Sequence, residues 1–180
     1  MSIKYVDGQI DLIRAQASSV QVAHGRSIAA INSDPTLSPE GKRVQLAENG
    51  ERVKAQLQDL KAKEMQLVDD EILRLERMLD AKAGSTSSDI IAFRDAQDRA
   101  ERISDSDEAT RILSRADRTG DMALAHAVFR RAIDSGWKST VQAFAQANPD
   151  LAEAANDLTT WKRFREPDMN RALAYSSAWS

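Results

Sequence analysis

The chain has 180 residues and a formal net charge of −3, with 29% charged and only 5% aromatic residues. The charge is spread evenly along the chain, which argues against a nucleic-acid-binding protein, because such proteins gather basic residues into one stripe. The sequence contains no cysteine, which excludes disulfides and thiolate chemistry. No apolar stretch reaches the length of a membrane span, so we expect a soluble protein made in a cytoplasm.

Ala, Leu, Arg, Glu, Asp and Gln make up most of the chain, and no run alternates apolar and polar residues with a period of two. These side chains lose little rotamer freedom in a helix, so the composition predicts an all-α protein. The expected architecture is an N-terminal antiparallel, coiled-coil-like hairpin (1–83), a linker (84–88), a helical bundle (89–165) and a C-terminal segment (166–180).

The first arm of the hairpin is predicted over residues 3–31. Its apolar or small residues recur at alternating intervals of three and four, which is typical of one face of a helix. This stripe consists of Ile3, Val6, Ile10, Ile13, Ala17, Val20, His24, Ser27 and Ile31.

A turn signal and a helix start follow directly. Pro35 disfavours helix at the residue before it. Ser38 is a good N-cap, Pro39 suits the first helical position, and Glu40 places a negative charge at the helix N-terminus. A connection this short predicts that the two helices run antiparallel.

The second arm is predicted from Pro39 to about Lys82. Its apolar stripe keeps the three-four spacing and then shifts by one residue at Val68, in the manner of a coiled-coil stutter. The opposite face is densely charged, with candidate ion pairs Asp59–Lys63 and Asp70–Arg74.

The second arm is longer than the first, so its distal stripe needs another surface to cover it. The stripe can pack within the chain or against another copy of the chain, and the sequence leaves both open. The residues that we assign to a protein contact there are Leu67, Ile72, Leu75 and Leu79.

In the C-terminal half, helices are predicted at about 89–102, from a cap at Ser106, at about 138–147 and at about 150–165. Gly120, Ala125, Phe129 and Ala132 resemble the second half of a tetratricopeptide repeat, in which a glycine permits a tight turn and small residues let helices approach closely. No second copy of this pattern occurs, so we expect a compact bundle and no repeat array.

Two groups near the end of the chain are further candidates for protein contacts. The first is a basic and aromatic cluster at the end of the last long helix. The second is a pair of aromatics after a possible cap at Asp168, either docked onto the bundle or offered to another molecule. These candidates are Trp161, Arg163, Phe164, Arg165, Tyr175 and Trp179.

No catalytic or metal-binding constellation is visible. The two histidines, His24 and His126, are far apart, and neither belongs to a zinc-binding motif. We therefore expect no enzymatic activity, no cofactor and no metal ion.

Two stretches resemble small helical virion and head-assembly proteins of actinobacterial tailed bacteriophages: "INSDPTLSPEGKRVQLAENGERVKAQLQDLKAKE", and "RTGDMALAHAVFRRAIDSGW" together with "ANPDLAEAANDL". The resemblance implies a scaffold-like, minor capsid or connector-associated role, in the host cytoplasm during assembly and in the virion. The partners would be further copies of the chain and other virion or capsid proteins. The alternative is a cytoplasmic adaptor that binds a peptide in a tetratricopeptide-like groove.

Overall fold

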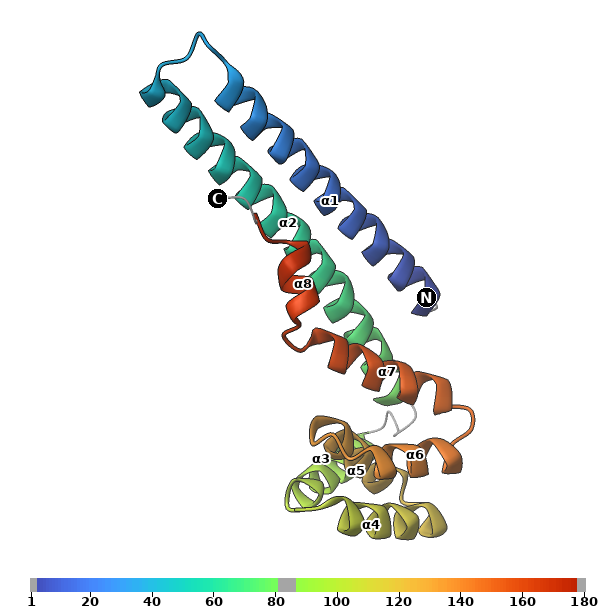
Figure 1. Ribbon diagram of the computed structural model, residues 1–180. Coiled ribbons are helices and arrows are strands. Elements are labelled where there is room, and N and C mark those ends of the chain that lie inside the picture. The colour runs from blue at the N-terminus through green and yellow to red at the C-terminus, as the bar shows by residue number, and fades with distance from the viewer. Residues whose placement is uncertain (1–2, 81–86, 178–180) are drawn as a thin grey trace. The chain divides into compact units, whose positions relative to one another are not determined.

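The computed structural model describes residues 3–80 and 87–177, and every regular element within them is a helix (Figure 1). Among these residues, no helix combines the length and apolar character that a membrane span requires. The predicted all-α class is confirmed. The helices are α1 (Ile3–Ser33), α2 (Pro39–Asp80), α3 (Ser87–Glu101), α4 (Ser106–Thr119), α5 (Met122–Asp134), α6 (Lys138–Ala147), α7 (Ala152–Arg165) and α8 (Met169–Ala174).

The two long helices α1 and α2 pack together as the predicted antiparallel hairpin (Figure 1). In the turn between them, the Asp34 carboxylate accepts hydrogen bonds from the backbone N–H of Thr36 (2.8 Å) and from its hydroxyl (2.6 Å). Ser38 caps α2 as predicted, because its hydroxyl accepts a hydrogen bond from the N–H of Gly41 at 3.1 Å. Pro39 is the first residue of the helix.

Helix α2 runs without a break from Pro39 to Asp80. Its buried positions confirm the predicted shift at Val68, where the spacing gains an extra interval of four. The prediction placed Ile72 in the shifted stripe, but Ile72 is half-buried and Glu71 is buried instead. The buried residues from the middle of the helix onward are Val53, Leu57, Leu60, Glu64, Val68, Glu71, Leu75 and Leu79. The predicted pair Asp59–Lys63 is present at 2.7 Å. The predicted pair Asp70–Arg74 is wrong, because Arg74 binds the neighbouring Glu71 instead, at 2.7 and 2.8 Å.

The chain forms two compact units: Met1–Asp70 with Phe164–Ser180, and Glu71–Arg163. The division therefore passes through α2 and α7. The predicted linker, 84–88, falls mostly outside the described residues, and Ser87 and Ser88 already belong to α3. The predicted last turn of the second arm, 81–82, also lies outside the described residues.

In the second unit, α3, α4, α5 and α6 pack on one another. Asp105 caps α4, one residue before the predicted cap at Ser106, and its carboxylate accepts from the N–H groups of residues 107 and 108. Gly120 ends α4 with φ = 73°, in the left-handed region that glycine adopts without strain. The predicted tight turn between the two helices is thus present.

Helix α5 is the centre of this bundle. Phe129 is fully buried and stacks on Phe144 of α6 with the ring centroids 4.1 Å apart. His126 meets the Phe144 ring edge-on, with the ring centroids 5.2 Å apart. Burial, with a smaller contribution from the charge of Arg130, lowers the pKa of His126 to about 4. This histidine is therefore a neutral packing residue at physiological pH.

Candidate interaction surface

The distal stripe of α2 is covered by the chain itself. Leu75 and Leu79 are 1% and 2% exposed. On the same stretch of α2, Arg130 of α5 pairs with Glu76 and Asp80, both at 3.2 Å. Of the two possibilities that the sequence left open, the structure shows the intramolecular one for these leucines.

The remaining predicted contact residues of α2 are half-buried: Leu67 in the first unit and Ile72 in the second. Glu76 in this stretch also binds Lys162 of α7, at 3.2 Å. Leu67 and Ile72 are therefore only partly exposed.

The basic and aromatic cluster of α7 is divided among different surroundings. Trp161 is buried in the second unit, and Arg163 is exposed. Arg165 pairs with Asp69 at 2.6 Å. The cluster therefore does not form one continuous patch.

Phe164 is half-buried between two guanidinium groups. Arg14 of α1 lies 5.5 Å from the centre of the Phe164 ring, and Arg171 of α8 lies 4.9 Å from it. Both distances are within the range of cation–π attraction. This ring therefore joins the chain that follows α7 to the hairpin.

Arg171 holds the segment between α7 and α8 in place. It is almost fully buried, and its Nη2 donates to the backbone carbonyls of Phe164 (2.6 Å) and Glu166. Asp168 caps α8 as predicted, with its carboxylate accepting from the N–H of Arg171 at 3.0 Å. The turn after Pro167 is thus ordered by its own side chains.

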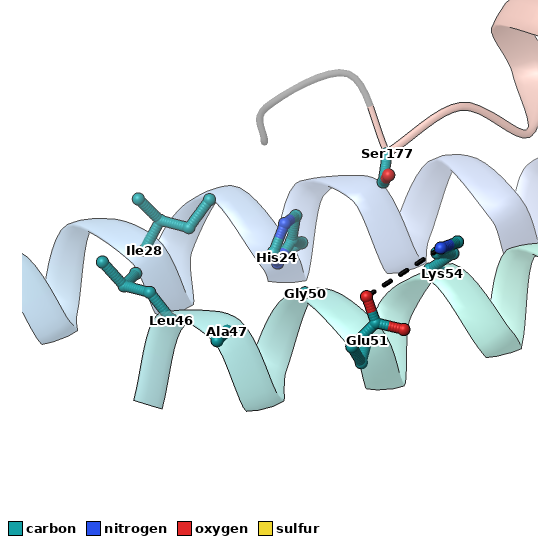
Figure 2. Close-up of a pocket in the computed structure, with 8 residues that line it drawn as sticks. All are labelled: His24, Ile28, Leu46, Ala47, Gly50, Glu51, Lys54 and Ser177. Carbon is teal, nitrogen blue, oxygen red and sulfur yellow. Dashed lines mark ion pairs between the residues drawn. The ribbon is translucent and has the colours of Figure 1, made fainter. Parts of the chain in front are cut away.

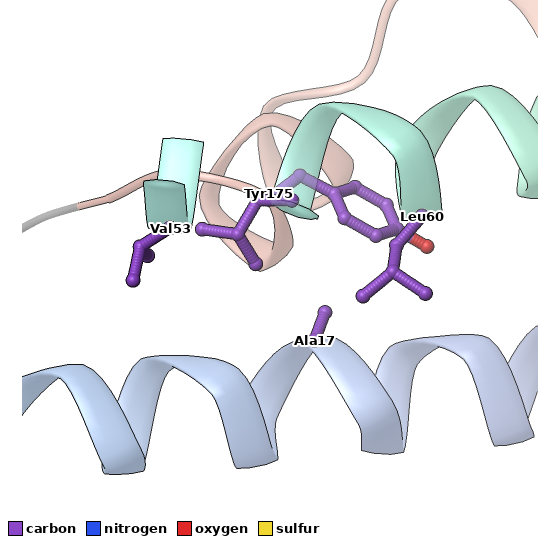
Figure 3. Packing of buried hydrophobic residues seen from close by; sticks show 5 residues of the cluster. Ala17, Val53, Leu60 and Tyr175 are labelled. Atoms are coloured by element: carbon purple, nitrogen blue, oxygen red, sulfur yellow. The ribbon is translucent and has the colours of Figure 1, made fainter. Parts of the chain in front are cut away.

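Tyr175 docks onto the hairpin, whereas the sequence interpretation placed the docked aromatics on the bundle. The ring packs with Ala17 of α1 and with Val53 and Leu60 of α2 (Figure 3). Gln21 of α1 donates to the carbonyl of Ser176 at 2.8 Å, which fixes the chain beyond α8 on the same face. Trp179, the other aromatic of this prediction, lies outside the described residues.

A buried polar triad anchors this docked segment. The Glu64 side chain is fully buried and receives two hydrogen bonds from Arg14, Nε to Oε2 and Nη2 to Oε1, both 2.9 Å long. The hydroxyl of Tyr175 donates to the same Oε2.

The electrostatics of the triad follow from this geometry. Burial raises the pKa of Glu64, but the hydrogen bonds from Arg14 and Tyr175 outweigh it, so the pKa lies below its ordinary value. Burial and the bond to Glu64 raise the pKa of Tyr175. The triad thus consists of a carboxylate, a guanidinium and a neutral phenol.

Near the turn, the hairpin has a second buried polar contact and a shallow groove. His24 Nδ1 lies 2.8 Å from Asn49 Nδ2, and Arg52 donates to Asn49 Oδ1 at 2.6 Å. Beside this contact is a cavity of about 530 Å³ between α1 and α2 (Figure 2). Its lining residues are His24, Ile28, Leu46, Ala47, Gly50, Glu51, Lys54 and Ser177.

Helix α1 has a second stripe, the outer seam, which faces away from the buried one and is exposed at every position. The members recur at alternating intervals of three and four, the spacing of a coiled-coil contact line. The three large members, Tyr5, Leu12 and Val22, are 52%, 58% and 51% exposed. The outer seam consists of Tyr5, Gly8, Leu12, Ala15, Ser19, Val22, Arg26 and Ala29.

The outer seam carries very little charge for a solvent-exposed helix. Only five of the 31 residues of α1 are charged, namely Lys4, Asp7, Asp11, Arg14 and Arg26, and none lies between the two arginines. In α2, 18 of 42 residues are charged. Since an exposed helix face is normally polar and charged, α1 is the unusual member of the pair.

Sequence inspection identified the buried stripe of α1 but missed the outer seam and the polar partners. The seam's three-four spacing is readable in the sequence once the stripe from Val6 to Ile31 is set aside. The triad has no such signal, because Arg14, Glu64 and Tyr175 are far apart in the chain.

The second unit contains a groove of about 790 Å³ between α4 and α6. Three arginines of α4 line it, Arg111, Arg115 and Arg118, with Asp117 among them. Burial raises the pKa of the Asp117 carboxyl. The groove is therefore predominantly basic.

Within residues 3–80 and 87–177, no group of three or more histidine, aspartate and glutamate side chains is arranged to hold a metal ion. Two surfaces of the described residues are candidates for contacts with other macromolecules: the outer seam of α1 and the basic groove between α4 and α6. Comparison of the chain with protein-family models, with curated proteins and with solved structures finds no match.

Proposed function

We propose that this chain is a structural protein of a tailed-phage virion that acts in head assembly through helix-mediated contacts with other protein chains. The resemblance of residues 31–64, 118–137 and 147–158 to small helical virion proteins supports this role. The observation that carries the proposal is the outer seam of α1, a coiled-coil-spaced line of exposed residues with a single charge.

The physical argument concerns the cost of leaving this face in water. Burying exposed side chains such as Tyr5, Leu12 and Val22 against another protein is favourable by about 25 cal/mol per Å² of apolar surface. A face with only one charge, Arg26, also has little to lose on desolvation. Helix α2 also exposes three large apolar residues, Val44, Leu73 and Met78, but 18 of its 42 residues are charged, so the contact is assigned to α1.

The proposal is tested in the phage that encodes the chain. Deletion of the gene should block the formation of normal particles, and the wild-type chain supplied from a plasmid should restore them. Val22→Asp should fail to restore particles, because it places a charge in the seam. Val44→Asp on α2 should restore them, since Val44 is similarly exposed, at 46%, but lies outside the seam.

Mass spectrometry of purified proheads and virions provides the direct readout. The chain should be present in many copies in at least one of these particles. A chain that is abundant in the infected cell but absent from both, or a deletion that leaves particle yield unchanged, would refute the virion role.

A second candidate is an adaptor that binds an acidic peptide in the groove between α4 and α6. The observation that favours it is the row of three arginines at residues 111, 115 and 118. Arg111→Glu together with Arg115→Glu should abolish binding to acidic peptides on an array and leave particle assembly unaffected. If the double variant instead blocks assembly without changing peptide binding, the adaptor reading fails.

A further inference from the structure

The two ends of the outer seam differ in charge and in side-chain size. Lys4, Asp7 and Asp11 give the N-terminal end of α1 a net charge of −1, and Arg26 gives the C-terminal end a positive charge. Arg14, which follows Asp11, is paired with the buried Glu64. No charged residue lies between Arg14 and Arg26. A helix with this distribution complements a copy of itself that runs in the opposite direction.

We propose that the outer seam of α1 forms an antiparallel, two-fold symmetric coiled coil with the outer seam of a second copy of this chain. The inference rests on the proposed function, because it names the partner of the same face. The centre of the contact lies between Ala15 and Ser19, where small side chains let two helices approach closely.

Antiparallel pairing sets a large residue against a smaller one along the seam. Tyr5 meets Ala29 of the second copy, and Leu12 meets Val22. Arg26 meets Gly8, where Asp7 and Asp11 of the second copy lie on either side. The two-fold symmetry repeats each of these contacts at the other end of the pair. The opposite charges therefore attract at both ends, and large side chains lie opposite smaller ones.

Parallel pairing lacks both advantages. It would stack Tyr5 on Tyr5 and Leu12 on Leu12, while Gly8 on Gly8 would leave a gap between them. Arg26 would face Arg26 at the C-terminal end of the contact, where like charges repel. Charge and volume therefore select the antiparallel direction.

The chain has no cysteine, so single cysteine variants report the direction of pairing directly. In the antiparallel pair, residue 12 of one copy lies opposite residue 22 of the other. The two residues 12 of the pair are about 15 Å apart along the helix axis, because α-helices rise about 1.5 Å per residue. Disulfides need Cα atoms within about 7 Å of each other, so only the first combination can react.

The experiment mixes purified full-length Leu12→Cys and Val22→Cys chains under mild oxidation and resolves the products on a non-reducing gel. The mixture should give a heterodimeric disulfide at least tenfold more abundant than the dimers of either variant alone. Leu12→Cys mixed with Val44→Cys controls for random collision and should stay monomeric. Efficient cross-linking of Leu12→Cys alone would overturn the antiparallel arrangement, and equal yields in all mixtures would overturn the interface.

Sedimentation velocity of the uncrosslinked chain measures the strength of pairing. One helix pair is a small interface, so we expect the dimer to dissociate at roughly micromolar concentrations. Val22→Asp should raise the dissociation constant at least tenfold, and Val44→Asp should leave it unchanged. A wild-type chain that stays monomeric throughout this range refutes self-pairing.

The two proposals fail separately. If the wild-type chain is monomeric but Val22→Asp still blocks particle assembly, the seam serves another virion protein and only the self-pairing is refuted. If the chain pairs as described but Val22→Asp restores normal particles, the assembly role is refuted and the dimer stands.

Discussion

Replacing Arg14 by methionine should destabilise the hairpin unit much more than an ordinary change on a helix surface. The Glu64 carboxylate has no exposure to solvent and takes two 2.9 Å hydrogen bonds from Arg14. Removing one partner of a fully buried pair costs about 3–5 kcal/mol, because the other charge stays buried without compensation. The side chain of Arg14 is 35% exposed, so solvent screening reduces the expected loss in the free energy of unfolding to about 2–3 kcal/mol.

The double variant makes this reasoning specific. Glu64→Leu alone should cost about 1–2 kcal/mol, since Arg14 can turn towards water. With both changes the buried charge is gone, and the cost should be about 1–2 kcal/mol, mainly from the hydroxyl of Tyr175, which loses its acceptor. The double variant is therefore expected to be more stable than the sum of the single losses implies, by about 2 kcal/mol.

Urea denaturation followed by far-ultraviolet circular dichroism measures all four proteins of this cycle. Losses that simply add would show that Arg14 and Glu64 do not stabilise each other, and the account of the triad would be wrong.

The dependence of stability on acidic pH is a second test of the triad. The pKa of folded Glu64 lies below its ordinary value of 4.5, so its stabilising effect is present above pH 4.5 and is lost as the pH falls through the folded value. The difference between the wild type and Arg14→Met should shrink over that range.

Three further predictions follow from other parts of the structure. Tyr175→Phe should loosen the docked segment and speed tryptic cleavage after Arg171, which is almost fully buried in the wild type, and unchanged cleavage would contradict the anchoring role. The pKa of His126 is about 4 in the folded chain against an ordinary value of 6.5, so the free energy of unfolding of the bundle should fall by about 3 kcal/mol between pH 6.5 and about pH 4. His126→Leu should abolish that dependence in acid denaturation curves. Phe129→Ala should cost about 3–5 kcal/mol in urea melts, because the ring is fully buried and stacked. The control Ile91→Ala, at a residue that is 70% exposed, should change stability by less than about 0.5 kcal/mol, and equal effects would contradict the assignment of Phe129 to the core.

The helices and most of their ends could be predicted from the sequence because local chemistry decides them. Ser38 and Asp168 act at helix starts through hydrogen bonds to residues three positions on. Pro39 suits the first helical position through its fixed φ, and Gly120 ends a helix through its own backbone angle. The shift of the buried stripe at Val68 is likewise a property of spacing alone. Where two local partners compete, the prediction was less secure: Arg74 has carboxylates three and four residues before it and binds the nearer one.

The partners of each surface were decided only by the tertiary structure. An apolar stripe must be buried, but its spacing does not say by what, so Leu75 and Leu79 gave no indication that their own chain covers them. In the same way, nothing near Tyr175 in the sequence points to Glu64, 111 residues away. Backbone and capping preferences act over a few residues, whereas burial and charge pairing select among all the surfaces of the folded chain, and only the fold brings those surfaces together.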